Sequence, residues 1–203
     1  MPIYEIKNTS IPTKIGVWKI TETTEELIES LENKGFDTTN LLETKNQQRL
    51  KQWLATRLLL IEFFENVTII YDDFGKPHLD NNWFISISHS NEFVAISLNK
   101  EKSCGIDIEK ISNKVERIKH KFLNPSDLKT VTSLSDLTIY WAAKEALYKY
   151  YGQKEVLFIE HLFIENFSKN SNSFKGKIKM SNFKLELNMS WEKIDEYILV
   201  YTL

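Results

Sequence analysis

The chain has 203 residues, with 26 Lys and Arg against 28 Asp and Glu, and its formal net charge is −2. Hydrophobic residues at 42% and aromatic residues at 12% are enough to bury a core, which excludes wholesale disorder. The near-neutral charge argues against a protein whose main task is to wrap nucleic acid. The length suits one domain of ordinary size, or two small halves that share a core.

Cysteine usage and targeting signals narrow the class further. Cys104 is the single cysteine, which excludes an intramolecular disulfide and a four-cysteine zinc site. The first residues lack the basic start and apolar run of a signal peptide. No stretch stays apolar over the roughly 18 residues that a membrane span needs. We therefore expect a soluble, reduced, cytoplasmic protein.

In the first part of the chain the pattern predicts two helices and several strands. Residues 15–20 form a short strand, and Thr23 or Thr24 caps a brief helix that Gly35 ends. The strongest helical signal runs from about Leu42 to Phe64, because apolar residues recur there at three- and four-residue spacing. Residues 67–71 then form a strand, followed by a turn over residues 72–75.

The second part repeats this order of strands and a long helix. Residues 85–88, 93–98 and 104–108 are expected to be strands, and residues 113–121 a basic helix. A further helix starts near Ser133 or Ser135 and ends at Gly152. Alternating runs after Val156 predict a meander of strands up to the C-terminus.

Because a long helix with strands occurs twice, the fold class is expected to be α+β with two similar halves, residues 1–102 and 103–203. Each half would pack its long helix on a small, mostly antiparallel sheet. The default place for an active site is the cleft between the two halves.

The acidic strand at residues 105–109 is the first candidate site. Residues two apart in a strand point to the same side, so Asp107 and Glu109 project together while their neighbours face the core. Paired carboxylates repel each other, and hard oxygen ligands suit Mg²⁺. The alternative is an edge strand with a solvated acidic face.

The helix at residues 141–149 places Trp141, Glu145 and Lys149 on one stripe at four-residue spacing. If Glu145 is a third carboxylate of the cluster, Lys144 and Lys149 lie beside a site for a polyanion. The alternative is a surface Glu145–Lys149 pair, worth a few tenths of a kcal/mol.

Further groups suited to phosphate lie in the first half of the chain. Lys76 stands between Gly75 and Pro77, which restrict the backbone and aim the ammonium group. Ser88 and His89 can both hydrogen-bond to a phosphate, although the segment could equally be a hairpin turn. Two of the three arginines, Arg49 and Arg57, lie eight residues apart on the long helix. They could bind phosphate in a bidentate manner, or only cover apolar side chains.

Together these motifs resemble one family. Five runs stand in the order seen in 4′-phosphopantetheinyl transferases of the Sfp type, which have two similar halves: Gly75-Lys76-Pro77, Ile87-Ser88-His89-Ser90, Gly105-Ile106-Asp107-Ile108-Glu109, Lys121-Phe122-Leu123-Asn124 and Trp141-Ala142-Ala143-Lys144-Glu145-Ala146-Leu147-Tyr148-Lys149. The resemblance implies transfer of phosphopantetheine from coenzyme A to a serine of an apo acyl or peptidyl carrier protein, with release of 3′,5′-ADP. It also implies a monomer.

The resemblance assigns a role to each candidate residue. Asp107, Glu109 and Glu145 would hold Mg²⁺, or Mn²⁺ in its place, against the coenzyme A pyrophosphate. Glu145 would also help to deprotonate the carrier serine, and Lys149 would bind the phosphates. The coenzyme A contacts would come from Arg49, Arg57, Lys76, Pro77, Ser88, His89, Lys144 and Lys149. The family often has a second glycine after the residue that matches Gly152, and this chain has none there.

The carrier is expected to dock on the basic segment from Asn113 to Lys121, because family carriers are acidic. Two other readings stay open. The protein could be a silent member of the fold that binds coenzyme A or a carrier without transfer. It could also be a Mg²⁺-dependent phosphodiesterase that hydrolyses a nucleotide without any carrier.

Overall fold

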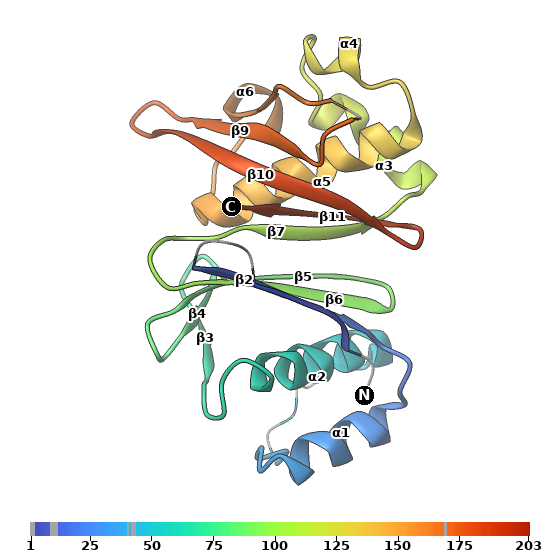
Figure 1. The fold of residues 1–203 in the computed structure, drawn as a ribbon, viewed down its shortest axis with the longest axis vertical. Coiled ribbons are helices and arrows are strands. Elements are labelled where there is room, and N and C mark those ends of the chain that lie inside the picture. The colour runs from blue at the N-terminus through green and yellow to red at the C-terminus, as the bar shows by residue number, and fades with distance from the viewer. Residues whose placement is uncertain (1–2, 9–11, 40, 42–43, 169) are drawn as a thin grey trace.

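The computed structural model describes residues 3–8, 12–39, 41, 44–168 and 170–203. Their strands form two antiparallel sheets, one from each half of the chain (Figure 1). The expected α+β class with two halves is therefore confirmed. No helix in these ranges is both long enough and apolar enough to cross a membrane.

The first sheet has the strand order β1-β2-β6-β5-β4-β3, and two helices accompany it. Its strands are β1 (Ile3–Asn8), β2 (Thr13–Lys19), β3 (Ile69–Tyr71), β4 (Pro77–Leu79), β5 (Phe84–Ser90) and β6 (Phe93–Asn99), and its helices are α1 (Thr24–Asn33) and α2 (Gln47–Ile61). α2 packs on the sheet, and α1 lies against α2 on its far side (Figure 1).

The second sheet has the order β7-β11-β10-β9-β8, so β7 forms one of its edges. Its strands are β7 (Ile106–Lys110), β8 (Leu162–Glu165), β9 (Ser173–Lys179), β10 (Lys184–Ile194) and β11 (Tyr197–Thr202). The helices of this half are α3 (Asn113–Ile118), a 3₁₀ turn (Lys119–Lys121), α4 (Asp127–Thr130), α5 (Leu134–Tyr151) and α6 (Phe158–His161).

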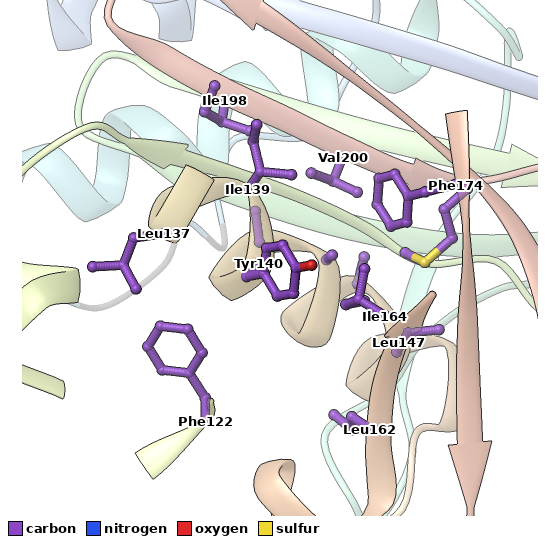
Figure 2. Close-up of a cluster of buried hydrophobic side chains, with 14 of the residues drawn as sticks. Phe122, Leu137, Ile139, Tyr140, Leu147, Leu162, Ile164, Phe174, Ile198 and Val200 are labelled. Atoms are coloured by element: carbon purple, nitrogen blue, oxygen red, sulfur yellow. The ribbon is translucent and has the colours of Figure 1, made fainter. Parts of the chain in front are cut away.

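The two halves form successive layers of helix, sheet, sheet and helix. In β6, Val94 and Ile96 face α2, while Phe93 and Ala95 face the second sheet. This alternation follows from the two-residue period of a strand. In the second half, α5 packs on the far face of its sheet, and Figure 2 shows Leu147 of α5 in that core.

Local sequence signals explain where the helices begin and end. Thr23 and Glu26 form a capping box at the start of α1, and the Ser133 side chain caps α5. Gly152 ends α5 in the left-handed conformation, with φ of 70°. The predicted early start of α2 is wrong: Asn46 caps a helix that begins at Gln47. Leu42, where we expected that start, lies outside the described residues.

Four short elements were missed by the sequence analysis. They are β1, β4, α4 and α6, which carry no clear periodicity, and each depends on neighbouring elements for its backbone or packing partners. The strand predicted from Cys104 begins at Ile106, and Cys104 itself is buried before it. The segment that could have been a turn continues as β5 to Ser90, so Ser88 and His89 are strand residues.

Candidate active site

Asp107 is the centre of the candidate site. It lies in β7, where Ile106 and Ile108 pack between the two sheets and Asp107 points the other way. Its Oδ1 accepts hydrogen bonds from Ser88 Oγ and Lys149 Nζ, each at 2.7 Å. Its Oδ2 is buried and has no hydrogen-bond partner in the described part of the chain. An unpartnered buried carboxylate oxygen is costly, and a bound cation or donor would relieve that cost.

Serine hydroxyls of β5 join the two halves at this point. Because β7 is an edge strand, its outer N–H groups lack a neighbouring strand. Ser86 Oγ accepts from the N–H of Ile106 at 3.2 Å, and Ser88 Oγ accepts from the N–H of Ile108 at 3.1 Å. The Ser88 hydroxyl therefore accepts a hydrogen bond from the backbone of β7 and donates one to the Asp107 carboxylate, which holds that carboxylate in place.

α5 approaches β7 closely because of a glycine. A Cβ atom at Gly105 would overlap the backbone oxygen of Ala146 in α5. This close contact brings the following turns of α5 over β7, and Lys149 Nζ reaches the carbonyl of Ile106 at 3.1 Å as well as Asp107. The predicted stripe of Glu145 and Lys149 thus faces the acidic strand.

Two carboxyl groups of the site, Glu109 and Glu145, have raised pKa values. Burial and the charge of Asp107 raise the pKa of Glu145 to about 7, with a further contribution from Glu109. Burial and Asp107 also raise the pKa of Glu109. Lys114 opposes both shifts, and its Nζ lies 3.9 Å from Glu109 Oε1. The site therefore holds more negative charge than its own lysines neutralise, which favours an added cation.

The donor chemistry fits a hard divalent cation such as Mg²⁺, since all three candidate ligands are carboxylates. The unpartnered Oδ2 of Asp107 offers one coordination position without any rearrangement. Among the described residues, however, no three His, Cys, Asp or Glu side chains are already grouped as a metal site. Lys149 instead supplies the positive charge at Oδ1 of Asp107.

Two adjacent cavities extend from this site along the first half. One, of about 380 Å³, is lined by Arg49, Gln52, Trp53, Thr56, Arg57, Tyr71, Gly75, Pro77, Ile87 and His89. The other, of about 180 Å³, is lined by residues 74–77, 85–87, 148–149 and 152–153. They share Gly75, Pro77 and Ile87, so we call the two cavities together the groove.

The wider end of the groove is basic and aromatic. The Arg57 guanidinium stacks on the Trp53 ring, with its Cζ 3.2 Å from the ring centroid. Burial lowers the pKa of Arg57 to about 10, which leaves it charged at neutral pH. Desolvation and the charges of Lys149 and Arg49 lower the pKa of His89. An anionic ligand in the groove would reverse that shift and would meet Arg49, Arg57 and His89 together.

Comparison with known proteins finds a family that the second half of the chain resembles. Residues 103–202 match the model of the 4'-phosphopantetheinyl transferase superfamily. The second half of the chain is therefore similar to this superfamily. The 4'-phosphopantetheinyl transferase gsp of Aneurinibacillus migulanus is 28% identical over 107 residues. That alignment covers 50% of this chain and 45% of the relative, so the match spans less than half of the relative's length.

The superfamily match covers the half that carries Asp107, Glu109, Glu145 and Lys149. The groove residues of the first half, including Arg49 and His89, lie outside the matched range. Their inclusion in the site depends on the geometry described above, in which Ser88 and Lys149 meet at one oxygen of Asp107.

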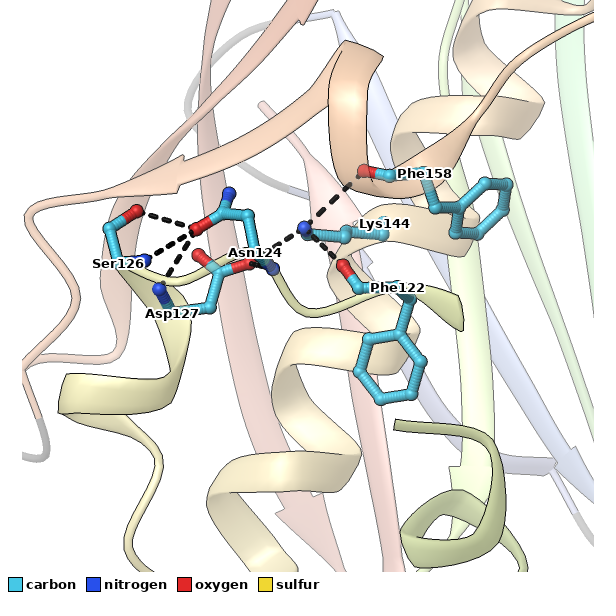
Figure 3. A network of polar contacts seen from close by, with 6 residues as sticks. All are labelled: Phe122, Asn124, Ser126, Asp127, Lys144 and Phe158. Carbon is cyan, nitrogen blue, oxygen red and sulfur yellow. Dashed lines mark hydrogen bonds and ion pairs between the residues drawn. The ribbon is translucent and has the colours of Figure 1, made fainter. Parts of the chain in front are cut away.

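Lys144, which was expected to contact coenzyme A, lies away from this site and lines neither cavity of the groove. Its ammonium group is fully buried on another side of α5 (Figure 3). Nζ pairs with Asp127 Oδ2 at 2.7 Å and donates to the carbonyls of Phe122 at 2.5 Å and Phe158 at 3.4 Å. Asp127 also accepts from the N–H of Asn124. Lys144 therefore fastens the segments around α4 and α6 to α5.

Lys76 lines the groove, but its ammonium group is already engaged across the two halves. Nζ donates to Ser103 Oγ and to the carbonyl of Tyr150, each at 2.9 Å. Sequence reasoning missed Ser103 and also the buried partner Asp127. Neither stands in a recognisable motif, and only the run Lys121-Phe122-Leu123-Asn124 hinted that the segment before Asp127 matters.

Proposed function

We propose that this protein transfers the 4′-phosphopantetheine group from coenzyme A to a serine of an apo acyl or peptidyl carrier protein and releases 3′,5′-ADP. One observation carries the proposal. Asp107, with an unpartnered buried oxygen, faces Glu145 and Lys149 next to a basic groove. The match of residues 103–202 to the 4'-phosphopantetheinyl transferase superfamily supports the class of reaction.

The groove suits the shape and charge of coenzyme A. Its wider cavity combines Trp53 and Tyr71 with two arginines and His89, a set that matches an aromatic base and a phosphate on its ribose. The narrower cavity leads to Lys149, where the pyrophosphate would meet a charge that can neutralise it. Pro77 and Gly75, in the wall shared by both cavities, would lie along the ligand.

Asp107, Glu109 and Glu145 are the residues that would hold Mg²⁺ or Mn²⁺, because their carboxylate oxygens are hard ligands. A divalent ion there would neutralise charge on the pyrophosphate oxygens as the transfer proceeds. Lys149, which pairs with Oδ1 of Asp107, would supply a positive charge beside the phosphates.

Glu145 is suited to accept the proton of the carrier serine. Without a metal ion its pKa is about 7, in the range where a carboxylate is an effective general base. In the proposed step, a bond forms between the serine oxygen and the phosphorus that carries pantetheine. The bond from that phosphorus to the bridging pyrophosphate oxygen breaks, and 3′,5′-ADP leaves with the electron pair. Lys149 would stabilise the charge on the leaving group.

The carrier would dock on the basic segment formed by α3 and the following 3₁₀ turn. This segment has four cations, Lys114, Arg117, Lys119 and Lys121, against one carboxylate. All four cations are exposed, while Val115 anchors α3 in the core. Since Lys114 lies next to Glu109, a carrier bound here would have its serine close to the site.

Intact-protein mass spectrometry tests the function directly. An apo carrier is incubated with this protein, coenzyme A and Mg²⁺, and its mass should increase by one phosphopantetheinyl group. EDTA and Asp107→Asn should each prevent the increase. Asp195→Asn, in the turn between β10 and β11, is the matched control and should retain it.

The alternatives predict different results in the same assay. Coenzyme A binding without a mass increase in several carriers would contradict transfer and favour a silent binding protein. Hydrolysis of coenzyme A in the absence of a carrier would favour a phosphodiesterase.

A further inference from the structure

A polar contact at the narrow end of the groove joins the two halves. Lys76 belongs to the loop between β3 and β4, whereas Tyr150 lies in the last turn of α5. Lys76 Nζ donates to Ser103 Oγ and to the Tyr150 carbonyl, each at 2.9 Å, and Ser103 Oγ donates to the same carbonyl at 2.7 Å. One ammonium, one hydroxyl and one carbonyl thus form a closed triangle.

The end of α5 provides a favourable place for this ammonium group. The last carbonyls of a helix lack N–H partners within the helix, and they carry the negative end of its dipole. Lys76 and Ser103 satisfy the carbonyl of Tyr150 in this position. Both acceptors of Lys76 are uncharged, and burial lowers its pKa.

The side chain of Lys76 lies directly on Gly152. A Cβ atom at Gly152 would overlap Cδ and Nζ of Lys76, and its φ of 70° also favours glycine. A second contact joins the same two loops, because Lys154 Nζ lies 5.7 Å from the centroid of the Phe74 ring. The backbone around Lys76 is itself restricted by Pro77 on one side.

We propose that Lys76, Ser103 and Gly152 form an interdomain clasp, in which Lys76 positions the end of α5 against the first half instead of binding the phosphates of coenzyme A. The clasp acts through Lys149, which stands one residue before Tyr150 and reaches Asp107. It sets the width of the narrow cavity, whose walls are the loop containing Lys76 on one side and the end of α5 on the other. Lys76 is therefore a positioning residue. The link to ligand binding rests on the proposed function.

Thermal unfolding of the ligand-free protein tests the clasp without reference to coenzyme A. Lys76→Met and Ser103→Ala should each lower Tm by about 2–4 °C, the shift expected for the net loss of one ordinary hydrogen bond in a chain of this size. The double variant should lose less than the two single losses added, because both remove the same triangle. Ser103→Thr, which keeps the hydroxyl, should retain most of the stability. Lys100→Met, which changes an exposed lysine three residues before Ser103, is the control.

Calorimetric binding of coenzyme A and of dephospho-coenzyme A tests the positioning role. Lys76→Met and Ser103→Ala should both raise Kd, by about tenfold at most, and by the same factor for the two ligands. If Lys76→Met weakens ligand binding while Ser103→Ala has no effect and Tm is unchanged, Lys76 is a phosphate ligand and the clasp is overturned. If the wild-type protein binds neither ligand, the proposed function fails, whereas the Tm measurements still decide the clasp.

Discussion

At the scale of single residues, the raised pKa of Glu145 suits proton transfer but lowers the stability of the folded protein. Its carboxyl titrates at about 7 in the folded protein and near 4.5 when it is unperturbed, because it is buried beside Asp107 and Glu109. Between these pH values the folded state binds more protons than the unfolded state. Stability should therefore fall as pH rises from about 4.5 to 7.

We predict that Glu145→Gln stabilises the metal-free protein at pH 8 and abolishes transfer. The gain is up to about 3 kcal/mol, the free energy that corresponds to the shift in pKa. Urea unfolding at a series of pH values would measure it, with Glu160→Gln on the exposed face of α6 as the control. An unchanged pH dependence in Glu145→Gln would show that this carboxyl does not titrate near 7.

Lys144 is next to Glu145 in the sequence, but it stabilises the fold where Glu145 destabilises it. Its buried pair with Asp127 is satisfied by carbonyl oxygens, so removing one partner leaves a buried charge. Lys144→Met should lower the free energy of unfolding by about 3–5 kcal/mol, whereas the double variant Lys144→Met/Asp127→Leu should lower it by less. Lys129→Met in α4 is the exposed control.

Coenzyme A binding separates this structural role from a role in the site. At a temperature well below Tm, Lys144→Met should bind coenzyme A within about twofold of the wild-type affinity. A tenfold or greater loss, about 1.4 kcal/mol, would return Lys144 to the coenzyme A site.

At the scale of elements, the contact between β7 and α5 determines the site. We predict that Gly105→Ala lowers the free energy of unfolding by about 1–3 kcal/mol, because its Cβ would overlap a backbone oxygen of α5 that cannot rotate away. The same change separates Asp107 from Glu145 and Lys149. Displacement of about 1 Å at a reacting centre can cost about 100-fold in rate, so activity should fall further than stability.

Gly176→Ala is the matched control for this prediction. Its Cβ would meet Met189 and Leu147, but the overlapping atoms are the ends of flexible side chains that can move. Circular dichroism melting and the carrier mass assay would be applied to both variants. Equal losses of activity in the two variants would contradict a special role for the approach of α5 to β7.

The elements themselves were largely predictable, because strong local signals produce them. The helix from Ser133 to Gly152 has both caps in its sequence, and the structure confirms it as α5. The direction of each side chain on α5 was harder to predict. α5 is buried on several sides, so periodicity did not distinguish Lys144, which faces Asp127, from Lys149, which faces Asp107.

At the scale of the whole molecule, the side-chain contacts between the two halves could not be predicted from the sequence. Ser88 meets Asp107 across two sheets, and Lys76 meets Tyr150 although 74 residues separate them. No periodicity within one element encodes such pairs. The family resemblance brought Ser88, Asp107 and Lys149 into one site, but it did not indicate the hydrogen bonds of Lys76.

The layered arrangement leaves α3 and its 3₁₀ turn on the surface beside the carboxylates, with their cations exposed. An acidic carrier approaching this surface would be steered by charge, mainly through the association rate, and high salt would weaken the effect. Lys114 interacts with Glu109, so its substitution would change the site as well as the surface. Arg117 and Lys119 come later in the same segment, so their substitution tests the docking surface apart from the site.

We predict that Arg117→Glu/Lys119→Glu raises KM for the carrier by about tenfold at low salt and leaves KM for coenzyme A unchanged, because only the carrier meets this surface. The difference from the wild type should shrink as salt is added, since exposed charges are screened. Lys175→Glu/Lys177→Glu, on β9, reverses the same number of charges on another sheet strand and serves as the control. Steady-state kinetics at two salt concentrations would measure both KM values for the wild type and the two double variants. An equal rise of the carrier KM in both double variants would show that net charge alone attracts the carrier, and an unchanged KM in the first would place the docking surface elsewhere.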